Sequence, residues 1–485
     1  MESTAELLFI LPAIIVAIGG VLVMMIDAFS DDADKSYWTA TAVLGLALIF
    51  SIRDMFIPGG TAFHDMMVYG GIAAYGGSVV LFGTFLCVLL SRDYLKAIGY
   101  HFGEMYSMIL FATTGMVILV GANTLITLFL GIETMSVALY VLAGFIKKDK
   151  AGIEAALKYF LLGAFATGFL LYGIALLYGA SGSIILTDIA ATENQGVLFW
   201  MGVAMLFVGF FFKISAVPFH MWTPDVYQGA PTNITAYMAT AAKAATIVAF
   251  ILVLGRALYA VQSEWTTVLS TIAVITMILG NLIALVQDNI KRMLAYSSIA
   301  HVGYILVGLA AGTATAYSAV MYYIFAYTLM NVGAFGVVAY FEKQKGCDFT
   351  SVENYAGLGY KFPLLGVLMS IFMFSLIGVP PFAGFIGKYL VFSAAIAEGL
   401  TATVIVAALA SVVAVYYYLR VVIYMYMHEA KESYNFVPPT LAFTVTLTII
   451  AALILYFGII PAGLIEVITN GVSSSTMLEA NGISY

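Results

Sequence analysis

FFKISAVPFHMWTPDVYQGAPTNITAYMATAAK, residues 211–243, is the stretch that decides how the chain folds. Lys213 ends a long apolar run, three prolines follow it, and Lys243 lies inside the next apolar run. A lysine at the centre of a membrane helix costs about 2.5 to 3.5 kcal/mol on insertion scales. Backbone groups that prolines release can exist at membrane depth only where protein or water satisfies them. The stretch therefore predicts a broken helix beside a polar interior, and an ion path is the first hypothesis.

Composition sets the class of protein. The 485 residues are 63% hydrophobic and 9% charged, and their mean hydropathy is +1.03. This balance predicts an all-α polytopic membrane protein. Two distant cysteines, Cys87 and Cys347, argue against an iron-sulfur cluster, a zinc site or a disulfide framework, so no metal is expected. No basic tract suggests nucleic-acid binding, and the N-terminus lacks the features of a signal peptide, so its first apolar run is expected to be retained.

Apolar runs of roughly 20 residues, the length that spans a bilayer as a helix, recur along the whole chain. We expect about fourteen transmembrane helices, the twelfth of them broken. Their centres lie near Val16, Leu44, Val80, Thr113, Met135, Phe165, Leu206, Thr246, Ile275, Ile305, Ala326, residues 363–398, Val413 and Ile449.

Basic residues predict the orientation of these helices. Connections after odd-numbered helices hold thirteen Lys and Arg residues, whereas those after even-numbered helices hold only Arg53 and Arg256. The positive-inside rule then places the odd connections in the cytoplasm and both termini outside. The thirteen are Lys35, Arg92, Lys96, Lys147, Lys148, Lys150, Lys291, Arg292, Lys343, Lys345, Lys361, Arg420 and Lys431.

The four remaining lysines are predicted to lie inside the membrane, as is the single deep carboxylate, Glu133. They are Lys158, Lys213, Lys243 and Lys388. A buried acid and a buried amine that pair keep their charges, and each changes its proton affinity when the partner leaves. One such pair can simply hold helices together, but four lysines with one carboxylate exceed simple pairing. Storage or transfer of protons is therefore the favoured interpretation.

Two histidines are candidates for linking these lysines. His220 follows Pro218 by two residues, and His301 lies in SSIAHVGYILVGL. Imidazole titrates near neutrality and shuttles protons, although a hydrogen-bonded structural role is common for either residue alone. Asp225 is expected to face water or cap the backbone, and the many Tyr, Phe and Met residues are interpreted as packing.

A faint internal repeat links two of the breaks. AVPFH at residues 216–220 and GVPPFAGFIGK at residues 378–388 both place Val-Pro before Phe, close to a membrane lysine. The breaks fall in the seventh and twelfth helices, so the two copies run in opposite directions, as in the inverted repeats of many transporters. Coincidence remains the alternative.

Several motifs together resemble a known family. They are GIETMSVALYVLAG, EAALKYFLLGAFATG with YGIALLYGASG, FKISAVPFHMWTPDVYQGAPT, KRMLAYSSIAHVGY and GVPPFAGFIGKYLVF. They are similar to motifs of the antiporter-like membrane subunits of proton-pumping NADH:quinone oxidoreductase, respiratory complex I. The similarity extends from about residue 105 to 418. It implies two inverted five-helix repeats, each with a Pro-broken helix, and a central polar axis along which protons cross.

The resemblance also assigns roles to individual residues. Glu133 resembles the fifth-helix glutamate that pairs with the seventh-helix lysine, here Lys213. Lys158 resembles a sixth-helix lysine near that pair, Lys243 the central eighth-helix lysine, and Lys388 the twelfth-helix residue of the exit side. His301 lies where polar residues link the two halves, and His220 is a further possible member of the relay. Sister subunit M has glutamate where Lys388 lies, and sister subunit L needs a long lateral helix for which the short tail after Pro461 leaves no room.

From this resemblance we expect four regions. Residues 1–100 form three helices, 101–258 the first repeat (helices 4–8), 259–428 the second, inverted repeat (helices 9–13), and 429–485 a last helix and tail.

The implied function is proton translocation as one subunit of a translocase, with no redox chemistry in this chain. NAD, flavin, iron-sulfur clusters and quinone are expected in partner subunits. The expected partners are the other membrane-arm subunits, among them sister subunit M and the small membrane subunits, together with lipids. The expected location is the bacterial inner membrane, with both termini in the periplasm. Two alternatives remain: a subunit of a multi-subunit cation/proton antiporter, and a purely structural membrane subunit.

Overall fold

The computed structural model describes residues 2–30, 32–193, 195–342, 349–429 and 438–473. The predictions that concern Lys343, Lys345, Cys347 and Lys431, and the end of the tail, lie outside these residues. Nearly all of the described chain is helical, apart from one short β-hairpin of β1 (Gly60–Ala62) and β2 (Met67–Tyr69). The strands are antiparallel, with Thr61 opposite Val68.

The helices follow one another with short connections. Those of the first half are α1 Glu2–Phe9, α2 Leu11–Phe29, α3 Ala33–Asp54, α4 Gly71–Ile98, α5 Gly103–Val120, α6 Leu125–Ala143, α7 Lys150–Ser181, α8 Leu186–Ala190, α9 Val197–Ile214, α10 Trp222–Gly229, α11 Thr232–Tyr237, η1 Met238–Ala242, α12 Lys243–Leu252 and η2 Val253–Ala257. Those of the second half are η3 Tyr259–Val261, α13 Gln262–Leu285, α14 Ile290–Ala311, α15 Ala314–Glu342, η4 Val352–Tyr355, α16 Leu358–Lys361, α17 Pro363–Ile377, α18 Ala383–Ala397, α19 Thr401–Met427, α20 Leu441–Ile459 and α21 Ala462–Ser473.

The predicted membrane spans are confirmed. Within the described residues, thirteen helical segments are long and apolar enough to cross a bilayer, and α17 and α18 are two shorter apolar helices. The two short helices occupy the predicted broken twelfth span, so the fourteen predicted centres all fall on helices. The hairpin and the terminal helix α21 were not predicted, because strands of three residues and a 12-residue helix are too short for a hydropathy signal.

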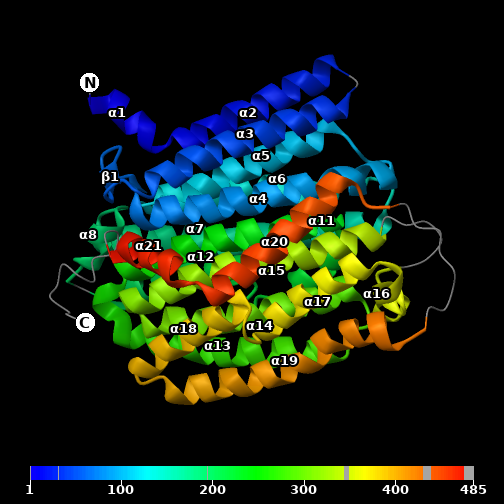
Figure 1. Cartoon of the computed structure of the whole chain (residues 1–485). Helices are drawn as coiled ribbons and strands as arrows, with labels where there is room; N and C mark the ends of the chain where they lie inside the picture. Colours follow the sequence, from blue (N-terminus) through cyan, green and yellow to red (C-terminus); the bar gives the residue numbers. More distant parts are fainter. Residues whose placement is uncertain (1, 31, 194, 343–348, 430–437, 474–485) are drawn as a thin grey trace.

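The long helices lie side by side, and their connections gather at two ends of the molecule (Figure 1). The helices α1 and α21 and the hairpin lie at one end, on the left of the view, and α16 with Lys361 lies at the other. We call the end with α16 the basic end. Two basic residues predicted for connections are instead buried: Lys291, which is 2% exposed, and Arg256, which is 9% exposed. Lys291 donates to the carbonyl oxygen of Ala230 beside the Pro231 break, at 2.8 Å, so a freed backbone group explains its burial.

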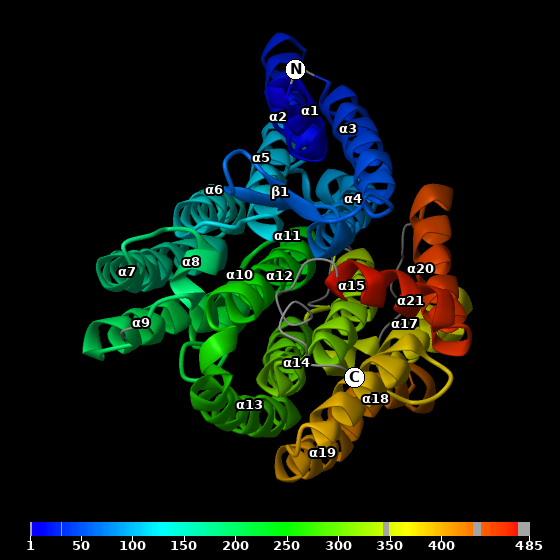
Figure 2. The same ribbon diagram turned by 90° about the vertical axis from the view of Figure 1, so that its left-hand side faces the viewer.

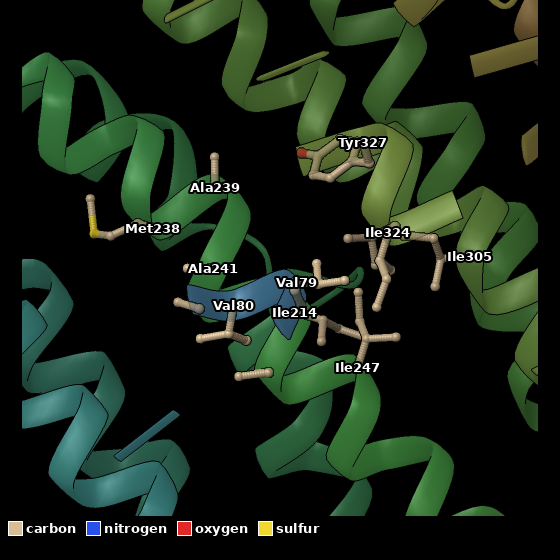
Figure 3. Close-up of a cluster of buried hydrophobic side chains, with 14 of the residues drawn as sticks. Val79, Val80, Ile214, Met238, Ala239, Ala241, Ile247, Ile305, Ile324 and Tyr327 are labelled. Carbon is tan, nitrogen blue, oxygen red and sulfur yellow. The ribbon is translucent and has the colours of Figure 1, made fainter. Parts of the chain in front are cut away.

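Four spans form the middle of the bundle. Seen nearly along the helices, α4, α12, α14 and α15 lie at the centre, and α2, α7, α13, α19 and α20 surround them (Figure 2). The span at residues 232–257 is buried along its whole length. Apolar side chains of α4, α9, α12, α14 and α15 meet in this centre (Figure 3), among them Val79, Ile214, Ile247, Ile305 and Ile324. The polar residues of the interior are therefore embedded in a dense apolar core.

The first predicted break lies between α9 and α10. Ser215 has a φ of 68°, which ends α9 in the left-handed region. The carbonyl oxygen of Phe212, released at this end, accepts from the Trp222 indole at 3.0 Å. The amide of Val217 donates to Thr276 Oγ1 at 3.1 Å. Protein groups thus satisfy the freed backbone, as a break at membrane depth requires.

The second break, between α17 and α18, has the same local form. Gly378 has a φ of 87° and ends α17, and the backbone amide of Gly384 donates to Ser375 Oγ at 3.2 Å. In each break a residue with positive φ is followed by Val-Pro, with a cis peptide bond before Pro218 and before Pro381. The two breaks lie in the seventh and twelfth spans, which run in opposite directions.

Candidate functional site

Three of the four predicted lysines are buried in the protein. Lys213 is in the last turn of α9, Lys243 begins α12, and Lys388 is in α18. Their exposed fractions are 6%, 2% and 6%. Each lies at an irregularity of its helix: Lys213 beside the first break, Lys243 directly after the π-helical turn η1, and Lys388 shortly after the second break. π-Helical turns occur frequently at functional sites.

Lys213 contacts hydroxyl groups on α6. Its Nζ donates to Ser136 Oγ at 2.6 Å and to the Tyr140 hydroxyl at 3.3 Å. Glu133, three residues before Ser136, accepts from Thr167 Oγ1 at 2.9 Å. No carboxylate of the described chain lies within 4.0 Å of Lys213 Nζ. The Lys213 amine therefore binds the face of α6 that also carries Glu133, but the two residues do not form the predicted ion pair in this conformation.

Lys158 lies elsewhere. Its Nζ is 2.7 Å from Glu154 and 2.7 Å from Asp225, and 41% of its side chain is exposed. Asp225 also binds Arg292, at 2.6 Å. Lys158 precedes Thr167, the partner of Glu133, by nine residues of α7, or about 13 Å along the axis at 1.5 Å per residue. The structure thus places Lys158 toward the basic end and not beside Lys213, and it makes Asp225 the bridge between two cations.

Lys243 binds a serine on α14. Its Nζ donates to Ser298 Oγ, and the Tyr327 hydroxyl donates to the same oxygen at 2.7 Å. The Tyr227 ring lies 5.6 Å from the ammonium. The central lysine is therefore held by groups from α10, α14 and α15.

His301 is one turn further along α14 and is 1% exposed. Its Nδ1 is 2.7 Å from the Tyr323 hydroxyl, and its Nε2 is 3.0 Å from the Tyr418 hydroxyl. Tyr418 is also hydrogen-bonded to Ser297. A neutral imidazole donates from only one nitrogen, so one of the two phenols donates to His301 and the other accepts from it.

Lys388 donates to the carbonyl oxygen of Ile377 at 2.9 Å and to Ser411 Oγ at 3.2 Å. Its ammonium lies 4.7 Å from the centre of the Tyr304 ring. The lysine therefore satisfies the backbone carbonyl that the second break releases, and it remains in contact with two hydroxyl-bearing side chains.

His220 is not brought into this line by any contact of the described residues. It is half-buried, and its Nδ1 has no hydrogen-bond partner there. Its backbone carbonyl accepts from the amide of Thr223 at 3.0 Å. His220 thus belongs to the loop of the first break.

Sequence reasoning missed the hydroxyl groups that surround the buried cations. Tyr323 and Tyr327 are four residues apart on α15, and Ser297, His301 and Tyr304 follow a spacing of four and three on α14. Residues at these spacings share one helix face. Polar residues at this spacing near a membrane lysine or histidine are the pattern in the sequence that could have predicted these hydroxyl groups.

The arrangement suits reversible protonation. Each of the three predicted lysines that are buried donates to one serine: Lys213 to Ser136, Lys243 to Ser298 and Lys388 to Ser411. A serine hydroxyl both accepts and donates, so it can bind an ammonium and, with its own hydrogen reversed, a neutral amine. An amine without a carboxylate partner also leaves no unpaired buried anion behind when it releases its proton.

Comparison with known proteins gives the family of this chain. Residues 122–415 match the family model described as NADH:quinone oxidoreductase/Mrp antiporter, TM. The chain is 46% identical to NADH-quinone oxidoreductase subunit N of Salinibacter ruber over 461 residues, which cover 92% of both proteins.

Solved structures have the same fold. A chain of respiratory complex I from Thermus thermophilus with bound aureothin matches with a TM-score of 0.82 and 33% identity, over 94% of this chain and 98% of that one. A chain of the Mrp complex from Dietzia sp. matches with a TM-score of 0.86 over 98% of both chains. The latter pair is only 19% identical, so it shows a shared fold alone. By its matched motifs, its curated relatives and its structure, the chain belongs to the transmembrane family of NADH:quinone oxidoreductase and Mrp antiporter subunits.

Proposed function

We propose that the chain is a proton-translocating membrane-arm subunit of NADH:quinone oxidoreductase, and that it moves protons along its buried lysines. The observation that carries the proposal is that three buried lysines each bind a serine and no carboxylate within 4.0 Å among the described residues. Placing a lysine inside a membrane span costs free energy, and such residues usually have a function in transport. The 46% identity to NADH-quinone oxidoreductase subunit N of Salinibacter ruber indicates the reaction to which this proton transfer is coupled.

The route runs from Glu133 and Lys213 through Lys243 and His301 to Lys388. Separation of Glu133 from Lys213, the arrangement in this structure, favours release of the Lys213 proton toward Lys243, and Lys388 passes it to the exit side. The contacts of His301 support this order, because its Nε2 is 3.0 Å from the Tyr418 hydroxyl and its ring lies 5.2 Å from that of Tyr327, which binds the Lys243 serine. We assign Lys158 to the basic-end mouth of the route together with Asp225, because both are partly exposed there. His220 is assigned to the loop of the first break, within reach of a relay that rearranges.

Electron transfer is assigned to other subunits, which hold NAD, flavin, iron-sulfur clusters and quinone. Quinone reduction reaches this chain as an electrostatic change in a neighbouring membrane subunit. The neighbours we propose are sister subunit M and the small membrane subunits. We propose the bacterial inner membrane as the location, with the basic end in the cytoplasm and both termini in the periplasm, because the sequence assigns thirteen of fifteen connection Lys and Arg residues to the loops after odd-numbered helices.

The second candidate is a subunit of a cation/proton antiporter, which the fold shared with the Dietzia Mrp chain favours. Purification of the chain from native membranes separates the two. Partners that carry flavin and iron-sulfur clusters support the oxidoreductase, and a membrane complex without them supports the antiporter.

Alanine substitution tests the lysine relay. Lys213→Ala, Lys243→Ala and Lys388→Ala are each expected to lower proton pumping by about tenfold or more, because acid-base groups contribute roughly 10² to 10⁴ in rate. Assembly, measured by native electrophoresis, is expected to persist. Lys148→Ala, at an exposed position of the basic end, is the control and leaves pumping unchanged. Normal pumping in all three variants would leave only a structural role for the chain.

A further inference from the structure

A buried amide lies between His301 and Lys388. Asn281, in α13, is 1% exposed. Its Nδ2 donates to the carbonyl oxygen of Met277 at 2.7 Å and to the Tyr304 hydroxyl at 3.0 Å. Its Oδ1 accepts from the Tyr417 hydroxyl at 2.9 Å. One side chain therefore joins α13 to α14 and α19 through two phenols.

Chemistry fixes the orientation of this amide. The carbonyl oxygen of Met277 can only accept, so the atom that faces it is the amide nitrogen. The oxygen must then face Tyr417, which has to donate to it. The second hydrogen of the nitrogen goes to Tyr304, whose own hydroxyl hydrogen remains free to donate elsewhere. Asn281 thus makes Tyr417 a donor toward α13 and leaves Tyr304 a donor toward its other neighbours.

Those other neighbours are the two ends of the proposed route. The Tyr304 ring lies 4.7 Å from the Lys388 ammonium. The Tyr417 ring lies 4.4 Å from that of Tyr418, whose hydroxyl is 3.0 Å from His301 Nε2. Asn281 therefore joins a phenol that contacts Lys388 to a phenol that packs against the partner of His301.

Close packing supports this placement. A Cβ on Gly280 would lie 2.7 Å from the amide nitrogen of Ala300, and one on Gly303 would lie 2.7 Å from that of Met277. Two glycines therefore bring α13 and α14 into backbone contact beside Asn281. Small residues at an interface are the usual device for such an approach in membranes.

We propose that Asn281 is a positioning residue for proton passage between His301 and Lys388, acting by holding Tyr417 as a donor to its own amide and leaving the Tyr304 hydroxyl free to donate toward Lys388. This inference rests on the proposed function. The amide holds the phenols and carries no proton itself, because a carboxamide has donors and an acceptor but no group that titrates near neutral pH.

The test uses the intact complex in proteoliposomes. Asn281→Leu keeps the size of the side chain and removes its hydrogen bonds. Since two of the three lost hydrogen bonds hold the phenols, we expect pumping to fall by at least about fivefold, the size of one such bond, with normal assembly and a larger solvent isotope effect on the pumping rate. Thr266→Val is the matched control, because Thr266 lies on the same helix and its hydroxyl donates, among the described residues, to the carbonyl oxygen of Ala310 alone. The control is expected to pump normally.

A double variant separates positioning from general stability. If Asn281 acts through Tyr417, Asn281→Leu combined with Tyr417→Phe pumps no worse than Asn281→Leu alone, since residues in one network have non-additive effects. Additive losses, or normal pumping in Asn281→Leu, would overturn the inference. Should Asn281→Leu fail to assemble, Tyr304→Phe and Tyr417→Phe replace it, and normal pumping in both overturns the inference equally. Lys388→Ala tells the two proposals apart: if it stops pumping and Asn281→Leu does not, the relay stands and the role of Asn281 falls.

Discussion

At the scale of single residues, hydroxyl groups and not carboxylates define the interior. Serines on three different helices bind Lys213, Lys243 and Lys388, and phenols bind both nitrogens of His301, whereas the fourth buried lysine, Lys291, pairs with Glu342. A fixed ion pair would hold an ammonium charged, whereas a hydroxyl can bind the amine in either protonation state. The interior is thus polar enough to keep lysines in a membrane and free of strong traps for their protons.

One serine tests this reading. Ser298→Ala removes the shared partner of Lys243 and Tyr327. We expect pumping to fall about fivefold, as for one lost hydrogen bond, with unchanged amounts of assembled complex. Ser318→Ala is the control, since this buried serine on α15 bonds only the carbonyl oxygen of Ala314 on its own helix. Equal pumping in the two variants would contradict a role for Ser298.

The sequence indicated that four lysines lie inside the membrane, and the structure buries three of them but not Lys158. Lys213, Lys243, Lys388 and His301 are recognisable because charge inside an apolar run is costly. Lys158 has the same signature in the sequence, yet it lies toward the basic end, where Asp225 and Glu154 bind it. Hydropathy averages over a whole span, so it cannot tell the middle of a long helix such as α7, with 32 residues, from its first turns, where Lys158 lies.

At the scale of elements, the two broken helices carry the chemistry. Each places a lysine near freed backbone, and in the second break the lysine itself satisfies the carbonyl oxygen of Ile377. The prolines predicted both breaks from the sequence, because proline lacks the backbone N–H donor of a helix and fixes φ. The partners that satisfy the breaks, Thr276 for Val217 and Trp222 for Phe212, come from packing that no local pattern encodes.

A glycine in the second break gives the element-scale prediction. Gly378 has a φ of 87°, and an added Cβ would lie 3.0 Å from Lys388 Cδ. Gly378→Ala is expected to cost about 1 to 3 kcal/mol through its backbone conformation and to displace Lys388, so that pumping falls along with thermal stability. Gly99→Ala is the matched control: its φ is 77° and its Cβ would meet nothing within 4 Å. It should lose stability alone, and a similar loss of pumping there would refute the role of contact with Lys388.

At the scale of the whole molecule, close helix packing holds the relay in place. Fourteen spans and their order followed from hydrophobic run length and proline position, both local properties of the sequence. The central position of α12, α14 and α15 did not, because the hydropathy of these spans is similar to that of the outer ones. Their interfaces depend on small residues that permit backbone contact.

Gly303 tests that packing. Gly303→Leu is expected to force α13 away from α14, since even a Cβ at this position would lie 2.7 Å from the amide nitrogen of Met277. We expect the complex to lose this subunit, as seen by native electrophoresis and immunodetection in membranes. Gly168→Leu is the control, because Gly168 is exposed on α7 and a Cβ there meets nothing within 4 Å. Assembly of the Gly303 variant at the level of the control would show that the interface tolerates a gap.

The full burial of the span at residues 232–257 determines which helices are in contact with the lipid bilayer. Because that span touches no acyl chains, a thicker or thinner bilayer acts on the outer helices α2, α3, α19 and α20, which tilt to match it. The central lysine is mechanically insulated from the lipid, so organisms that remodel their fatty acids with temperature can keep the same interior.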